Sequence, residues 1–224
     1  EVADTLSRKS PYGKQCKKRG GMWYTPVSGI WQTVWLENVP KHYIEEIKMT
    51  PSLTEVEISI KGSIKGFQAV VFARDAMISE YVFTENTGKI KIENPIHWTV
   101  ENPYLYDITI TTEEDEVDSY FALRTIEIKK IKGINRVCLN EKPIFMHGIL
   151  DQGYFEDGIY LPENETEFEK DILRMKELGF NMLRKHIKIE PESFYYVCDK
   201  LGMLVLQDMI NNGGYSYMFD TVLP

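Results

Sequence analysis

Alternating apolar and polar residues dominate the chain up to about residue 130. The clearest cases are residues 56–60, 89–92 and 106–110. A period of two is typical of strands that bury one face. Asn86-Thr87-Gly88 and the acidic run 113–116 separate such segments and predict hairpin turns. Several short strands at this spacing predict an antiparallel β-sandwich.

The pattern changes at about residue 131, where a hairpin is predicted around Asn140-Glu141-Lys142. Helical spacing of apolar residues follows. Asn164 is the expected N-cap, with Glu167 three residues later as in a capping box, and Gly179 is the expected stop.

A second helix is predicted from Pro191 to Gly202, between short apolar strands at residues 181–184 and 203–206. The last of these is a continuous apolar run of the kind buried on both faces. Strand, helix, strand, helix, strand predicts a right-handed parallel βα series.

Composition narrows the function classes. The 224 residues are 43% hydrophobic and 27% charged, which is ordinary for a globular protein and excludes a disordered or collagen-like chain. The net charge of -8 disfavours a nucleic-acid binder that depends on phosphate contacts. The chain contains no run of about 18 apolar residues, so no membrane span is predicted. Residues 1–10 lack the apolar core of a signal peptide.

Three cysteines, Cys16, Cys138 and Cys198, are odd in number and widely scattered. This pattern suggests neither a disulfide framework nor a metal cluster. It fits a reducing compartment best, so a cytoplasmic location is expected.

Five segments carry a family resemblance: residues 26–37 (PVSGIWQTVWLE), 98–106 (WTVENPYLY), 121–126 (FALRTI), 139–145 and 177–181. In this order they resemble successive parts of glycoside hydrolase family 2, which includes β-galactosidases, β-glucuronidases and β-mannosidases. The matched parts are the end of the sugar-binding jelly roll, two motifs at the end of the immunoglobulin-like domain, and the first two barrel strands.

The resemblance implies a multidomain, mainly β fold. Residues 1–38 are expected to be the C-terminal strands of the jelly-roll sugar-binding domain, and residues 39–126 a complete immunoglobulin-like β-sandwich. Residues 127–224 are expected to be the N-terminal part of a (β/α)8 TIM barrel, incomplete because a closed barrel needs about 250 residues.

The implied activity is that of a retaining β-glycosidase acting on terminal β-linked sugars. Such an enzyme needs two carboxyl groups about 5–5.5 Å apart. In this family both are glutamates on later barrel strands, so the pair is expected beyond Pro224 and this chain alone is expected to be inactive. Two Asn-Glu pairs within the chain are not expected to be catalytic, because Asn140-Glu141 lies in the predicted hairpin turn and Asn164-Glu165 lies at the predicted start of a helix. The alternative is a non-catalytic carbohydrate-binding or architectural β-sandwich module.

Candidate substrate-binding residues follow from the position of such active sites at the carboxyl ends of the barrel strands. The candidates are Asp151, Gln152, Arg184, His186 and Asp208, with Tyr154, Gln207, Asn211 and Asn212 nearby. They supply donors and acceptors for sugar hydroxyls. The family often has His at the position of Gln152 and a His three residues after the Arg at position 184, whereas here His186 follows Arg184 by two.

Alternatives stay open for the same residues. Arg184 either contacts sugar or only pairs with a carboxylate such as Asp208, and Asp151 either binds substrate or caps a loop. His186 is either a sugar contact or a structural polar residue. Glucuronide recognition would need a positive group, for which Arg184 or Lys185 is available.

Aromatic residues and partners complete the expectations. Trp23, Trp31, Trp35 and Trp98 could form a stacking platform for sugars, but their placement among strands favours core or interdomain packing. No cofactor or metal ligand is assigned, although a divalent or sodium ion is possible in the full enzyme. The expected partner is a carbohydrate, with neither nucleic acid nor membrane. An incomplete barrel would leave Leu183, Val205 and Leu206 uncovered, which predicts a homo-oligomer or pairing with another chain.

Overall fold

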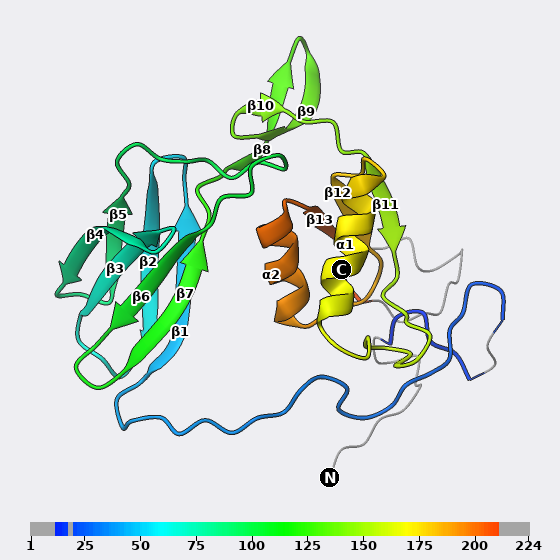
Figure 1. Ribbon diagram of the computed structural model, residues 1–224, viewed down its shortest axis with the longest axis horizontal. Coiled ribbons are helices and arrows are strands. Elements are labelled where there is room, and N and C mark those ends of the chain that lie inside the picture. The colour runs from blue at the N-terminus through cyan, green and yellow to red at the C-terminus, as the bar shows by residue number, and fades with distance from the viewer. Residues whose placement is uncertain (1–11, 18–19, 211–224) are drawn as a thin grey trace. The chain divides into compact units, whose positions relative to one another are not determined.

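The computed structural model describes residues 12–17 and 20–210 and divides into two compact units (Figure 1). One unit runs from Trp35 to Phe145. The other combines the described residues up to Val34 with the chain from Met146 onward. No helix in the described ranges is long and apolar enough to cross a membrane. The jelly-roll, immunoglobulin-like and barrel identities of the three expected domains stay predictions.

Seven antiparallel strands in two sheets build most of the unit from Trp35 to Phe145. The first sheet has the order β1-β2-β5 and the second the order β4-β3-β6-β7. Their bounds are β1 Ile44–Pro51, β2 Glu55–Gly62, β3 Phe67–Ala73, β4 Ala76–Phe83, β5 Thr87–Lys91, β6 Tyr106–Thr111 and β7 Glu116–Phe121.

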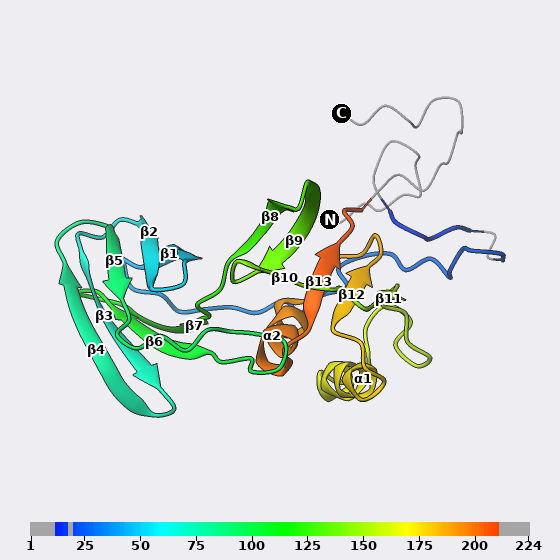
Figure 2. The same ribbon diagram turned by 90° about the horizontal axis from the view of Figure 1, so that it is seen from above.

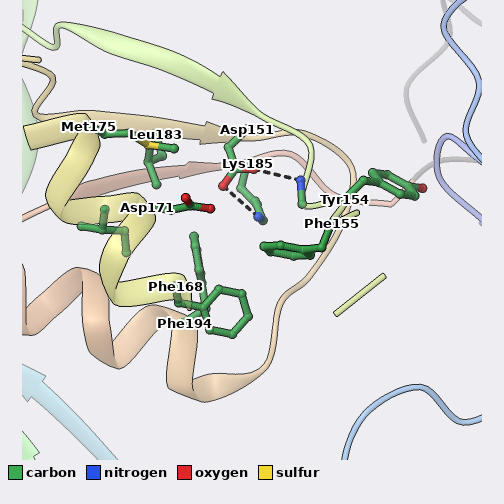
Figure 3. Close-up of a pocket in the computed structure, with 11 residues that line it drawn as sticks. Asp151, Tyr154, Phe155, Phe168, Asp171, Met175, Leu183, Lys185 and Phe194 are labelled. Atoms are coloured by element: carbon green, nitrogen blue, oxygen red, sulfur yellow. Dashed lines mark hydrogen bonds and ion pairs between the residues drawn. The ribbon is translucent and has the colours of Figure 1, made fainter. Parts of the chain in front are cut away.

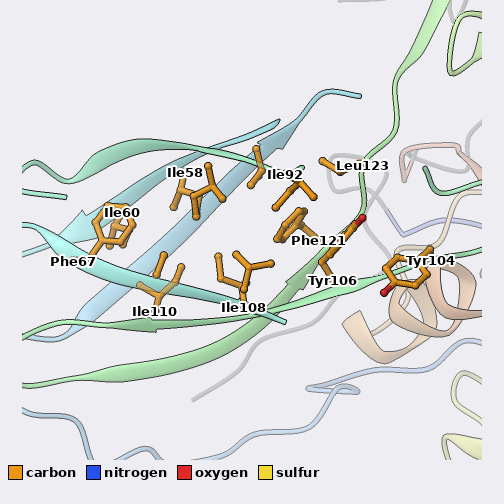
Figure 4. Packing of buried hydrophobic residues seen from close by; sticks show 14 residues of the cluster. Ile58, Ile60, Phe67, Ile92, Tyr104, Tyr106, Ile108, Ile110, Phe121 and Leu123 are labelled. Carbon is orange, nitrogen blue, oxygen red and sulfur yellow. The ribbon is translucent and has the colours of Figure 1, made fainter. Parts of the chain in front are cut away.

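The core of this unit lies between the two sheets (Figure 4). Ile58 of β2, Val71 of β3 and Ile108 of β6 are buried, while their sequence neighbours along each strand are more exposed. A strand places successive side chains on opposite faces, so the period of two in the sequence becomes one buried face per sheet. The predicted antiparallel strands are therefore confirmed.

A small third sheet follows, with the order β10-β9-β8. Its strands are β8 Ile126–Ile131, β9 Ile134–Leu139 and β10 Lys142–Pro143. Asn140 and Glu141 both have positive φ angles, 49° and 68°, as a two-residue hairpin turn of type I′ requires. The predicted hairpin is confirmed, and Asn140 further stabilises it by donating from Nδ2 to the Trp98 carbonyl at 2.9 Å.

The second unit contains a parallel sheet with the order β11-β12-β13 and two helices (Figure 2). The elements are β11 Gly148–Asp151, α1 Thr166–Glu177, β12 Met182–Lys185, α2 Glu192–Leu201 and β13 Leu204–Gln207. This confirms the predicted strand–helix alternation.

Both helices cover the same face of the parallel sheet. Leu183 of β12 packs into one buried cluster with Phe168 of α1 and Phe194 of α2, and Val205 of β13 packs against that cluster. The expectation that Leu183 and Val205 are uncovered is therefore wrong, because the helices that connect the strands shield them. Leu206 points to the other face and is 48% exposed, as expected.

Glycines end both helices as predicted, with left-handed φ angles of 87° at Gly179 and 77° at Gly202. The predicted N-cap is one residue early, because α1 begins at Thr166 with Glu165 as the capping position. Asn164 still accepts a hydrogen bond from the Thr166 amide at 3.1 Å. The Glu167 carboxylate pairs with Lys170 at 2.6 Å.

Candidate functional site

The carboxyl ends of the three parallel strands bring the predicted site residues to one edge of the sheet. In the strand register, Asp151 lies beside Lys185, and Lys185 beside Gln207. Two backbone hydrogen bonds extend the ladder past the strand ends, from the His186 amide to the Asp151 carbonyl at 2.8 Å and from the Asp208 amide to the Lys185 carbonyl at 2.9 Å. Backbone hydrogen bonds therefore hold the residues that follow the strands at one edge of the sheet.

Arg184 and His186 converge on Asp208. The Nε of Arg184 donates to Oδ2 of Asp208 at 2.9 Å, and Nε2 of His186 lies 4.0 Å from the same oxygen. The pairing that was one of the two alternatives for Arg184 is therefore present. Half of the Arg184 side chain, 52%, remains exposed, so its other N–H groups remain open to solvent.

Burial lowers the pKa of His186, and the charge of Lys14 acts in the same direction. The imidazole is therefore neutral at pH 7 and offers one donor and one acceptor. Within the described part of the chain, its Nδ1 atom is buried without a hydrogen-bond partner. Together, an exposed guanidinium, a carboxylate and a neutral imidazole form a set that can bind hydroxyl groups of a sugar.

Asp151 is turned away from this trio. Its Oδ2 accepts from Nζ of Lys185 at 2.9 Å and its Oδ1 accepts from the Gly153 amide at 2.8 Å (Figure 3). The loop-capping role that was an alternative for Asp151 is therefore present. For Gln152, the side-chain Oε1 is buried and has no hydrogen-bond partner within the described ranges.

Lys185 is unavailable to a sugar. Its side chain is 1% exposed and its Nζ also pairs with Oε1 of Glu190 at 2.5 Å. The ring of Phe194 lies 4.4 Å from this Nζ atom. The idea that Lys185 meets the carboxylate of a glucuronide is therefore wrong, because the ammonium lies on the helix-covered side of the sheet.

A buried ion cluster next to the edge was not predicted from the sequence. Lys188 is 1% exposed, pairs with Oε2 of Glu190 at 2.8 Å, and donates to the carbonyls of Gly153 and Tyr160, both at 2.6 Å. Desolvation lowers the pKa of Lys188 to about 8 even though Glu190 opposes the shift. The only signal in the sequence is the charged run that directly follows a buried strand, and such a run is more often solvated.

A cavity of about 50 Å³ lies between the sheet and the two helices (Figure 3). Asp151, Asp171 and Lys185 line it together with the rings of Phe168 and Phe194. Burial raises the pKa of Asp171, and the charge of Asp151 adds to this shift. The space suits a few water molecules and is far below the roughly 300 Å³ of an ordinary ligand pocket. The cavity is therefore too small to hold a sugar.

The tryptophans divide between two environments. Trp98 is buried in its unit, as expected for core packing, and Trp31 packs edge-on against Tyr160 at 4.5 Å. Trp35 is 67% exposed, so core packing is wrong for this residue, while interdomain packing stays a prediction. Asn211 and Asn212 lie outside the described residues. No group of three or more His, Cys, Asp or Glu that could hold a metal ion occurs in the ranges 12–17 and 20–210.

Comparison with a family model adds independent information. Residues 43–124 match the model described as glycosyl hydrolases family 2. This range covers the two-sheet unit and not the strand-end edge.

Two curated relatives extend the match along the chain. A β-galactosidase of Alteromonas mediterranea is 26% identical over 220 residues, with 84% of this chain and 20% of the relative covered. A putative β-glucuronidase of Formosa agariphila is 28% identical over 203 residues, with 81% and 24% covered. The chain thus spans about a quarter or less of the length of these relatives.

Solved structures agree in fold. A Faecalibacterium prausnitzii β-glucuronidase superimposes with a TM-score of 0.69 at 25% identity, covering 76% of this chain and 28% of that one. A Dictyoglomus thermophilum β-D-glucuronidase gives 0.67 at 22% identity, with 76% and 30% covered.

Proposed function

Because the chain belongs to glycoside hydrolase family 2, we propose that it is part of a retaining β-glycosidase that hydrolyses terminal β-linked sugars. The names of the relatives, β-galactosidase and putative β-glucuronidase, support this class of reaction. The catalytic pair of glutamates is proposed to lie outside residues 1–224. The chain's own contribution is then to bind and orient the sugar.

The domain identities belong to the same proposal. Seven strands in two antiparallel sheets fit an immunoglobulin-like sandwich for residues 39–126. Three parallel strands covered by helices on one face fit the first part of a (β/α)8 barrel for residues 127–224. Residues 1–38 are proposed to belong to a jelly-roll sugar-binding domain. The exposed Leu206 face would be covered by further barrel strands, a second copy or another chain.

One observation carries the proposed sugar-binding role, namely the meeting of Arg184, His186 and Asp208 at the carboxyl ends of neighbouring strands. In a barrel of this kind the active site is built at that end. Arg184 would donate to a hydroxyl or carboxylate of the sugar, while Asp208 holds the guanidinium in place. Asp151 and Gln152 would act from the loop after β11.

The first test is the nucleotide sequence of the source gene past the codon for Pro224. We expect the reading frame to continue for about 200 residues or more, with an Asn-Glu pair at the end of a later strand and a second Glu further on. A stop codon directly after Pro224 would overturn the hydrolase proposal. It would favour the alternative of a non-catalytic carbohydrate-binding module.

The complete gene product then tests the site. We expect it to hydrolyse a p-nitrophenyl β-D-galactoside or β-D-glucuronide, and Arg184→Gln to lower kcat/KM by about tenfold or more, since a hydrogen bond from a charged donor is lost. Arg174→Gln, a change at an exposed position of α1, is the matched control. Equal activity of the two variants would remove Arg184 from the binding site.

A further inference from the structure

The loop after β12 contains an isoleucine, Ile187, in a backbone conformation that is unfavourable for this residue type. Ile187 has a φ of 51° and is buried. A β-branched side chain rarely adopts this left-handed region, because its Cβ substituents crowd the backbone. Such a residue persists only where its surroundings hold it in place.

A second residue of the same kind lies in the neighbouring loop. Ile159, between β11 and α1, has a φ of 58°. Ile187 directly precedes Lys188, and Ile159 directly precedes Tyr160, whose carbonyl accepts a hydrogen bond from Lys188 at 2.6 Å. Both unfavourable conformations therefore adjoin the contacts of a single ammonium group.

The Lys188 ammonium has polar and aromatic partners from several segments of the chain. It bonds to the Gly153 carbonyl after β11, to the Tyr160 carbonyl and to the Glu190 carboxylate of its own loop. The rings of Tyr160 and Trp31 lie 4.6 and 5.4 Å from its Nζ atom. A buried charge is tolerated only with such complete pairing. These contacts join the loops after β11 and β12.

The opposite side of the same loop faces the proposed site. Arg184 and His186 meet Asp208 there, whereas Lys185, Lys188 and Glu190 are buried. Ile187 lies between His186, which faces the site, and Lys188, which is buried, so the chain passes from the site to the ion cluster at this residue. The Asp151 carbonyl holds the His186 amide on one side, and the turn at Ile187 fixes the direction of the backbone on the other.

We infer that Lys188 is a positioning residue: its ammonium holds the left-handed turn at Ile187 and thereby places His186 beside Asp208. The bearing of this turn on sugar binding rests on the proposed function, but the turn itself does not. A buried ion pair seldom adds net stability over an apolar replacement. Stability therefore does not explain the presence of the cluster, whereas the placement of His186 does.

The test separates this role from simple packing. In Lys188→Met, we expect the His186 ring, followed by NMR in the 224-residue chain, to lose its lowered pKa and to titrate near its ordinary value. Adding Ile187→Gly should restore the wild-type titration, because glycine adopts the left-handed conformation without a clamp. Ile189→Gly, in the same loop at an exposed position, is the matched control and should restore nothing.

Two further variants allow the same test if Lys188→Met or the double variant fails to fold. Lys188→Gln, which keeps side-chain N–H donors without the charge, can be used in place of Lys188→Met. Ile187→Asn can be used in place of Ile187→Gly, since asparagine also tolerates the left-handed region. A folded Lys188 variant whose His186 titration is unchanged would overturn the inference. Rescue by the Ile189 control as effective as that by the Ile187 substitution would also overturn it.

The complete gene product distinguishes this inference from the proposed function. If both hold, Lys188→Met lowers kcat/KM on p-nitrophenyl β-glycosides about tenfold or more, and Ile187→Gly in the same protein restores most of it. If only the inference holds, the NMR changes appear in a protein that neither binds nor cleaves these glycosides.

Discussion

Gly153 leaves no room for any other residue in the loop after β11. Its φ is 63°, and a Cβ atom there would collide with Oε1 of Glu190 and lie 2.8 Å from Nζ of Lys185. We expect Gly153→Ala to lower the free energy of unfolding by at least about 2 kcal/mol, because backbone strain and the displaced ion pair add together. Urea unfolding of the chain measures this loss.

Gly179→Ala is the matched control for this prediction. Gly179 has a φ of 87° in the same unit, but a Cβ atom there meets nothing within 4 Å. Its substitution should cost only the strain of the left-handed backbone, about 1–2 kcal/mol. Equal losses for the two variants would show that the ion cluster tolerates a methyl group at Gly153.

The pKa of Lys188 predicts how stability depends on pH. Burial lowers this pKa from 10.5 to about 8 in the folded chain. Between these values the unfolded chain binds more protons than the folded chain, so the free energy of unfolding rises with pH in this window. Lys188 should contribute a rise of about 2 kcal/mol between about pH 7.5 and 9.5.

The measurement is a series of urea unfolding curves for the wild type and Lys188→Met across that pH range. The difference between the two proteins reports on Lys188 in this window, since His186, whose pKa is expected to change in Lys188→Met, titrates below it. Burial raises the pKa of Tyr160 to about 12, so this tyrosine acts above the window. A difference that stays constant, or reverses in sign, contradicts the depressed pKa.

At the scale of elements, the ends of helices were predictable where one residue type fixes the backbone. Gly179 and Gly202 adopt left-handed conformations that other residues avoid, and Pro191, with its fixed φ of -57°, is the capping residue at the start of α2. Asn164 was a weaker guide, because its side chain caps equally well from one residue before the capping position.

The candidate site was predictable only on its exposed side. Parallel strands end at one edge, so Arg184, His186 and Asp208 had to lie close together once the strand–helix alternation was recognised. Lys188 and Glu190 were not predictable, because charged residues are usually solvated and their pairing depends on contacts with Gly153 and Tyr160 in another loop.

The sequence pattern also could not predict which face of each short parallel strand is buried. Leu183, Val205 and Leu206 belong to apolar runs without alternation, which do not indicate which face the helices cover. Packing decides the matter, since α1 and α2 shield Leu183 while Leu206 faces the other way.

For the whole molecule, the two compact units predict two separate unfolding transitions. The unit from Trp35 to Phe145 has its own buried core between two sheets, and the parallel sheet with its helices has another. We expect residues 35–145, expressed alone, to fold and to unfold in urea at the midpoint of one transition of the full chain. The tryptophans of residues 35–145 are Trp35 and the buried Trp98, so tryptophan fluorescence of the isolated piece follows the unfolding of this unit.

Ile58→Ala identifies which transition belongs to that unit. Ile58 is fully buried between the sheets, so the substitution should cost about 2–5 kcal/mol in the isolated piece and in the matching transition of the full chain. The other transition should not move, because the second core contains no residue of this unit. An unfolded 35–145 piece, or a shift of both transitions by Ile58→Ala, would mean that the two cores fold as one cooperative unit.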